Sequence, residues 1–179
     1  MKPLLLLDID GPLNPYAAPA RRQPPQGYVR HITRPAGWPH GTLPVILAPA
    51  HGDELRALSD RYELVWATTW KEEANEWIGP RIGLPPLPWI EWPAMHAVRP
   101  DGTYWKTRYV VEYAAGRPFA WVDDEITALD REWVAAHHQA GSLLLRIDPG
   151  VGLVRADFVT LAVWVTGRGA AGAVRGPGP

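Results

Sequence analysis

Residues 4–11 read LLLLDIDG, four leucines followed by two aspartates and a glycine. A short, continuous apolar run of this kind is typical of a strand that is buried on both faces. Comparable runs recur along the chain, at residues 64–67, 87–90, 119–122 and 143–147. We therefore predict a parallel sheet of about five strands, of which residues 4–7 form the first.

Segments with a helical apolar pattern lie between and after these runs, at residues 53–61, 71–78, 105–115, 126–138 and 157–166. Strands that alternate with helices predict a doubly wound α/β fold, with helices on both faces of the sheet. Prolines cluster in two segments that we expect to be insertions forming a small cap, residues 11–45 and 80–105. We expect residues 1–166 to form one domain and the Gly-, Ala- and Pro-rich residues 167–179 to be a disordered tail.

The composition is that of one ordinary globular domain. The chain has 179 residues, 18 Lys and Arg against 19 Asp and Glu, and no cysteine. The lack of cysteine excludes thiolate zinc sites and thiol nucleophiles, and a net charge of −1 gives no global attraction to nucleic acid or to anionic membranes. The apolar run at residues 4–7 is too short for a signal peptide or a membrane span, so we expect a cytoplasmic protein that does not bind membranes.

Polar residues that could act in catalysis or bind a metal lie at the ends of three predicted strands and near the start of one predicted helix. In open α/β sheets the functional groups lie beyond the carboxyl ends of the strands. Clustered carboxylates repel one another unless they share a cation, and hard oxygen ligands favour Mg²⁺. A threonine hydroxyl, with the amides at the start of the next helix, would hold phosphate oxygens, and a lysine would add positive charge. The residues at these positions are, in chain order, Asp8, Asp10, Thr68, Thr69, Lys106, Asp123 and Asp124.

This ordered set resembles the four motifs of the haloacid dehalogenase (HAD) superfamily of phosphohydrolases. The resemblance spans about residues 3 to 125 and implies a HAD-like Rossmannoid fold with small cap insertions. Four stretches further resemble the bacterial HAD subfamily that is associated, by domain context, with multi-domain RNA-repair (Swiss Army Knife) proteins. These stretches are residues 66–75, 83–85, 121–124 and 146–153.

The resemblance implies a two-step phosphoryl transfer. Asp8 would attack phosphorus and form an aspartyl phosphate, while Asp10 would protonate the leaving oxygen and later deprotonate the hydrolytic water. Mg²⁺ would be bound by Asp8, by the main-chain carbonyl of Asp10 and by Asp123 or Asp124, with the choice between these two left open. Because dehalogenases of the superfamily lack the second aspartate of the first motif, Asp10 favours a phosphatase.

Each of these residues also has a simpler interpretation when it is taken alone. An Asp-x-Asp sequence commonly forms a turn or caps a helix, as does a pair of aspartates before a helix. Thr68 alone would be a helix N-cap, and Lys106 alone would be a solvated surface lysine. The order of all four elements and their strand contexts favour the catalytic interpretation.

The segment from Gly11 to Gly52 contains no Asp or Glu and leaves the first predicted strand directly beside Asp10. Its arginines would clamp phosphate and its aromatic residues would stack on a base, or the segment is a Pro-rich surface loop with solvated arginines. Tryptophans near the proposed site, such as Trp38 and Trp70, would add to such a stacking platform. The arginines that we predict to bind substrate are Arg21, Arg22, Arg30 and Arg34.

Three functions follow from the sequence. The first is a Mg²⁺-dependent phosphohydrolase of HAD type that acts on a phosphomonoester, with a nucleotide or an RNA or DNA end as candidate substrates. The second is a small-metabolite phosphatase of a biosynthetic pathway, and the third is a non-catalytic phospholigand-binding module. A shallow basic groove would favour polymer ends, and a closed apolar pocket would favour a small metabolite.

Overall fold

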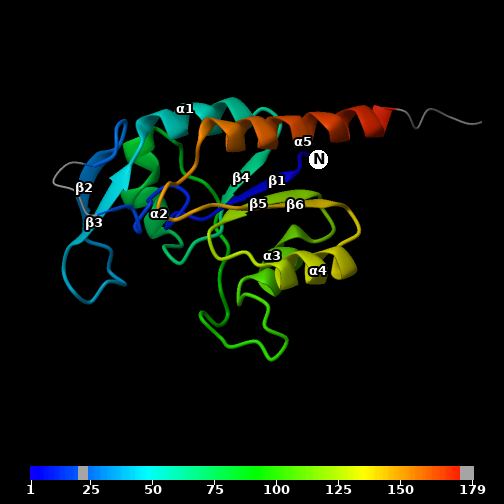
Figure 1. The fold of residues 1–179 in the computed structure, drawn as a ribbon, viewed down its shortest axis with the longest axis horizontal. Coiled ribbons are helices and arrows are strands. Elements are labelled where there is room, and N and C mark those ends of the chain that lie inside the picture. Colours follow the sequence, from blue (N-terminus) through cyan, green and yellow to red (C-terminus); the bar gives the residue numbers. More distant parts are fainter. Residues whose placement is uncertain (20–23, 174–179) are drawn as a thin grey trace, which may run out of the picture.

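The fold is α/β and is built on a four-stranded parallel sheet (Figure 1). The computed structural model describes residues 1–19 and 24–173. The strand order is β4-β1-β5-β6, and each pair of neighbours is parallel. The strands of this sheet are β1 (Leu4–Leu7), β4 (Glu63–Trp66), β5 (Phe119–Asp123) and β6 (Ser142–Arg146).

The strand β1 occupies an inner position and is buried on both faces, as its four leucines predict. Successive side chains of a strand point to opposite faces of the sheet. Leu5 and Leu7 accordingly join one apolar cluster, whereas Leu4 and Leu6 join the other, and all four are fully buried. Each buried leucine contributes about 1.5–3 kcal/mol relative to an exposed one. The sheet therefore divides the core into two layers.

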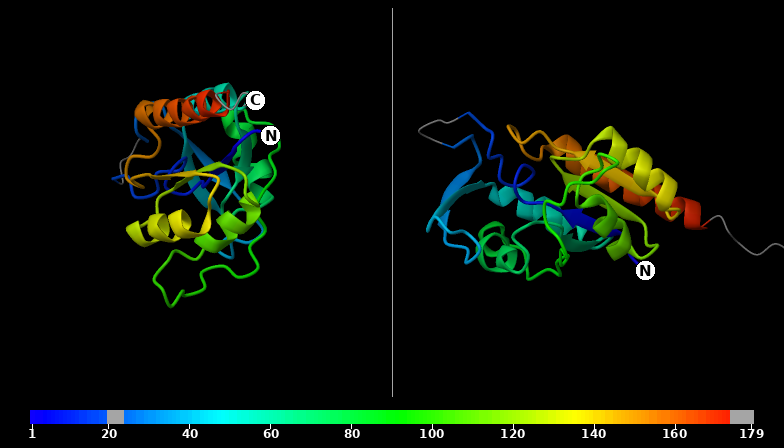
Figure 2. Two further views of the ribbon diagram at one scale, coloured as in Figure 1. Left: turned by 90° about the vertical axis from the view of Figure 1, so that its right-hand side faces the viewer. Right: turned by 90° about the horizontal axis from the view of Figure 1, so that it is seen from below.

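Helices cover both faces of the sheet, which confirms the predicted layering (Figures 1 and 2). Apolar residues of α1, α2 and α5 pack in the cluster of Leu5 and Leu7, and those of α3 and α4 pack in the cluster of Leu4 and Leu6. The helices are α1 (Pro49–Leu58), α2 (Glu73–Trp77), α3 (Thr107–Ala114), α4 (Ala128–His137) and α5 (Arg155–Ala173), with a 3₁₀ helix η1 (Gly79–Ile82) after α2.

The fifth strand that we predicted at residues 87–90 is reduced to a single parallel bridge. Trp66 of β4 pairs with Trp89, through hydrogen bonds from Trp66 N–H to the carbonyl of Pro88 and from Ile90 N–H to the carbonyl of Trp66. Proline has no N–H to donate, so Pro88 cannot extend the ladder. The sheet therefore has four strands.

A second, two-stranded antiparallel sheet was not predicted. It is formed by β2 (Val29–Thr33) and β3 (Leu43–Leu47), both largely within the first proline-rich insertion. Val45 and Leu47 point into the core, whereas Val29 and Ile32 are exposed. In Figure 1 this hairpin lies at the end of the molecule toward which β1 runs.

Several helix ends differ from the prediction. The helix α1 begins at Pro49 instead of residue 53, since proline is well suited to the first helical position. The helix α5 continues to Ala173, so residues 167–173 are helical and the disorder predicted for them is wrong. This stretch contains three alanines, which favour a helix, and three glycines, which do not. Residues 174–179 of the predicted tail lie outside the described residues.

No helix in the described part of the chain is long and apolar enough to cross a membrane.

Candidate metal centre and adjoining cavity

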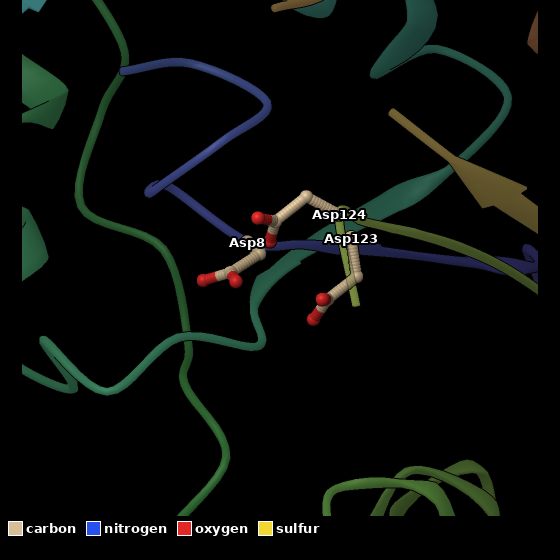
Figure 3. A group of neighbouring side chains, drawn as sticks. All are labelled: Asp8, Asp123 and Asp124. Atoms are coloured by element: carbon tan, nitrogen blue, oxygen red, sulfur yellow. The ribbon is translucent and has the colours of Figure 1, made fainter. Parts of the chain in front are cut away.

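Three carboxylates converge at the carboxyl ends of β1 and β5 (Figure 3). The two strands are neighbours, with Leu7 in register with Val122, so Asp8 and Asp123 follow at adjacent positions. Oxygen atoms of Asp8, Asp123 and Asp124 all lie within 4.8 Å of one another, and the three side chains are buried. The predicted convergence of the two strand ends is therefore present.

Lys106 lies directly between two of these carboxylates. It precedes α3, is 1% exposed, and its Nζ donates hydrogen bonds of 2.8 Å to Asp8 Oδ2 and 2.8 Å to Asp123 Oδ2. The interpretation of Lys106 as a solvated surface residue is therefore wrong. Burial favours the neutral amine, but the attraction of Asp123 and Asp8 is stronger in sum and raises the pKa of Lys106 above its usual value.

Aromatic rings enclose the same ammonium group. The Nζ of Lys106 lies 5.5 Å from the ring centroid of Tyr104, 5.8 Å from that of Trp105 and 6.0 Å from that of Trp92. A cation at such distances from an aromatic ring is attracted by the ring quadrupole. The rings exclude water and hold Lys106 toward the two carboxylates.

The acidic cluster has more negative charge than Lys106 can neutralise. Burial raises the pKa of Asp123 to about 7, with Asp8 adding to this rise and Lys106 opposing it. Burial also raises the pKa of Asp124, where the hydrogen bond from Tyr16 opposes the rise. A divalent cation would relieve this repulsion, and three carboxylates are a donor set of the hard oxygen type that Mg²⁺ prefers. Asp8, Asp123 and Asp124 could therefore hold a metal ion.

The position of Asp124 is fixed by contacts that sequence reasoning did not find. Tyr16 donates a 2.8 Å hydrogen bond to Asp124 Oδ2, and Arg146 Nε donates one of 3.0 Å to the main-chain carbonyl of Asp124. Gly11 has a φ of +92°, and a Cβ added to it would lie 2.5 Å from Asp124 Cγ. Tyr16 and Asp124 are far apart in the sequence, so no local spacing indicates their contact, whereas the glycine after Asp10 does mark a close approach.

Asp10 lies apart from the three-carboxylate cluster. Its Oδ1 accepts a 2.8 Å hydrogen bond from Asn14 Nδ2, and its Oδ2 accepts one of 2.9 Å from Trp70 Nε1. Burial raises the pKa of the Asp10 carboxyl, and the nearby charge of Asp8 raises it further. The role of its main-chain carbonyl as a metal ligand stays a prediction.

The structure around Thr68 and Thr69 differs from the prediction. Thr68 is buried after β4, but α2 begins only at Glu73, so Thr68 is not the helix N-cap and the amides beside it belong to a turn. Its Oγ1 accepts a long hydrogen bond of 3.5 Å from Trp70 N–H, and its main-chain carbonyl accepts one of 2.8 Å from Trp92 Nε1. The neighbouring Thr69 is exposed.

A cavity of about 330 Å³ opens beside Asp10. Its wall is formed by residues of both proline-rich insertions, including Trp38 and His96, and by residues that follow β4, including Thr69 and Trp70. Both insertions thus meet at the end of the sheet that carries the acidic cluster. A larger cavity of about 660 Å³ between α1 and α5 contains none of the predicted site residues.

The structure does not bring the described arginines of the first insertion to this cavity. Arg30 on β2 is exposed and lines a separate cavity of about 220 Å³ together with Asn14 and Tyr16. Arg34 is exposed and lines neither cavity. Arg21 and Arg22 lie outside the described residues.

Comparisons of the chain with protein-family models, with curated proteins and with solved structures found no match.

Proposed function

We propose that this protein is a Mg²⁺-dependent phosphohydrolase that removes phosphate from a phosphomonoester through an aspartyl phosphate on Asp8. The observation that carries the proposal is the buried arrangement of Asp8, Asp123 and Asp124 around Lys106, with Asp10 beside an open cavity. Lys106 supplies one positive charge against three buried carboxylates, and burying the remaining negative charge without a further cation is unfavourable.

The fold class that we propose is HAD-like. Two features support it: the parallel strand order β4-β1-β5-β6 and the position of every motif at the carboxyl end of a strand or just before a helix. Ligand sites of open α/β sheets lie at this edge. Fold alone does not define chemistry, so the proposal rests on the residues of the site.

In the first step, an Asp8 carboxylate oxygen forms a bond to phosphorus and the bond from phosphorus to the leaving oxygen breaks. Lys106 holds the Asp8 carboxylate in place through Oδ2 and compensates negative charge. Asp10 lines the cavity in which the leaving group would lie, and there it would donate a proton to the leaving oxygen. Bound Mg²⁺, held by Asp8, Asp123 and Asp124, would neutralise the phosphoryl oxygens.

In the second step, water attacks the phosphorus of the aspartyl phosphate and the bond to Asp8 breaks. Asp10 has become a carboxylate in the first step, so it takes the proton of the attacking water. Inorganic phosphate leaves, and Asp8 and Asp10 return to their initial states. A carboxylate pair with unequal environments suits this division of roles, and Asp8 and Asp10 differ in their hydrogen-bond partners.

The experiment that tests this proposal is release of phosphate from phenyl phosphate with and without Mg²⁺. We expect wild type to be active only with Mg²⁺, and Asp8→Asn to be inactive because the amide is not a nucleophile. The matched control is Asp60→Asn, at an exposed position, which keeps wild-type activity. Activity in Asp8→Asn, or activity that ignores Mg²⁺, would refute the proposal, and inactivity of wild type on all phosphomonoesters would favour a binding module.

A further inference from the structure

The cavity beside Asp10 has a chemical character that selects a substrate class. We propose that it holds the leaving group of the substrate, and that this group is a single aromatic ring system without a second negative charge. This inference rests on the proposed function, because Asp10 identifies the leaving-group side. It favours a small phosphomonoester over the end of a nucleic acid.

The charge of the cavity wall is the first support. Among the described residues that line the cavity, none is Lys or Arg, and the acidic ones are Asp10 and Glu73. A nucleic-acid end carries a further phosphate near its terminal one, and such sites are lined by basic side chains. Here a second anion would meet the Glu73 carboxylate, next to the protonated Asp10, and no described cationic side chain of Lys or Arg.

The shape and composition of the wall are the second support. Trp38, which is 39% exposed, and the partly exposed Met95 lie in the wall with His96. The buried Trp70 is fixed there by the hydrogen bond from its Nε1 to Asp10 Oδ2. A volume of about 330 Å³ is at the lower end of small-molecule pockets, which span about 300–1,000 Å³. Aromatic and apolar walls of this size suit one ring system.

Glu73, which contributes negative charge to the cavity wall, also attaches the first insertion to α2. Glu73 at the start of α2 accepts a hydrogen bond from the backbone N–H of Ala36 through Oε1. Residues 35–38 form a turn, which is closed by a 3.0 Å hydrogen bond from Trp38 N–H to the carbonyl of Pro35. Glu73 therefore presents Trp38 to the cavity and repels anions from it. A glutamine at this position would keep the acceptor oxygen and remove the charge.

The test uses two phosphonates that cannot be hydrolysed and that differ only in charge. These are (4-carbamoylbenzyl)phosphonate and (4-carboxybenzyl)phosphonate, titrated calorimetrically into the full chain with Mg²⁺. We expect the neutral amide to bind about tenfold more tightly than the carboxylate, because one added charge near the Glu73 carboxylate in a partly screened site costs about that factor.

Two variants separate this explanation from a general effect of charge. Glu73→Gln should reduce the preference to about threefold or less, since the repelling carboxylate is gone. Glu76→Gln is the matched control, an exposed glutamate of the same helix that does not line the cavity, and it should keep the full preference. Equal or tighter binding of the carboxylate, no binding of either probe, or an unchanged preference in Glu73→Gln would overturn the inference.

Failure of the inference is distinguishable from failure of the proposed function. Hydrolysis of phenyl phosphate that requires Asp8, together with no preference between the two phosphonates, would refute the inference alone. The expected preference with no hydrolysis of any phosphomonoester would support the binding site and refute the phosphohydrolase.

Discussion

Replacement of Lys106 by methionine tests the centre of the site through stability. Methionine has a similar length but no charge, so Asp8 and Asp123 would be left buried and facing each other. Each contact of 2.8 Å is worth about 6 kcal/mol of attraction at an effective dielectric constant of about 20, and most of it offsets the cost of burying the charges. Removing one partner of a buried ion pair costs about 3–5 kcal/mol. We expect Lys106→Met to lower the free energy of unfolding by about 3–5 kcal/mol at pH 8 without metal.

The assay is urea denaturation followed by circular dichroism. Lys71→Met is the matched control, because Lys71 pairs at the surface with Glu91, and such pairs contribute about 1 kcal/mol or less. Burial already raises the pKa of Asp123, and loss of the lysine that opposes this rise raises it further, so the folded state binds a proton more tightly than the unfolded state. The loss should therefore shrink as the pH falls from 8 to 5. A loss no larger than that of Lys71→Met would refute the buried ion-pair arrangement.

Three further predictions concern stability. Gly11→Ala should cost more than about 2 kcal/mol in urea denaturation, because its φ is +92° and the new Cβ would meet the Asp124 carboxyl. Burial lowers the pKa of His51, so the unfolded state takes up a proton below about pH 6.5 before the folded state does. The free energy of unfolding of His51→Phe relative to wild type should therefore rise as the pH falls from 7 to 5; an unchanged difference would contradict it. Thr127→Ala, which removes the capping box of α4, should lower the melting temperature by the equivalent of about 1 kcal/mol.

The acidic cluster could be predicted because its cause is local and general. A run of four leucines defines a fully buried strand, and parallel strands bring their carboxyl ends to one edge. Asp8 and Asp123 were therefore expected at the same edge of the sheet, and the pairing of β1 with β5 in the structure makes them neighbours. The choice between Asp123 and Asp124 could not be predicted, and the structure places carboxylate oxygens of both in the cluster.

Other features depend on tertiary contacts that leave no pattern in the sequence. The hairpin of β2 and β3 includes Pro44, a residue that normally argues against a strand, but this hairpin has only two strands and tolerates a missing donor. The contact of Tyr16 with Asp124 joins segments 108 residues apart. The interpretation of the arginines as a phosphate clamp followed from the composition of the insertion and its position beside Asp10, and neither tells which way β2 presents Arg30.

Detection of phosphate on Asp8 is the measurement that tests the central claim most directly. Wild type and Asp10→Asn would be mixed with phenyl phosphate and Mg²⁺, quenched in acid within milliseconds and mapped by peptide mass spectrometry. The account predicts a phosphorylated peptide that contains Asp8, more abundant in Asp10→Asn because the hydrolytic water lacks its base. Release of phosphate with no phosphorylated peptide, or with the phosphate on another residue, would contradict it.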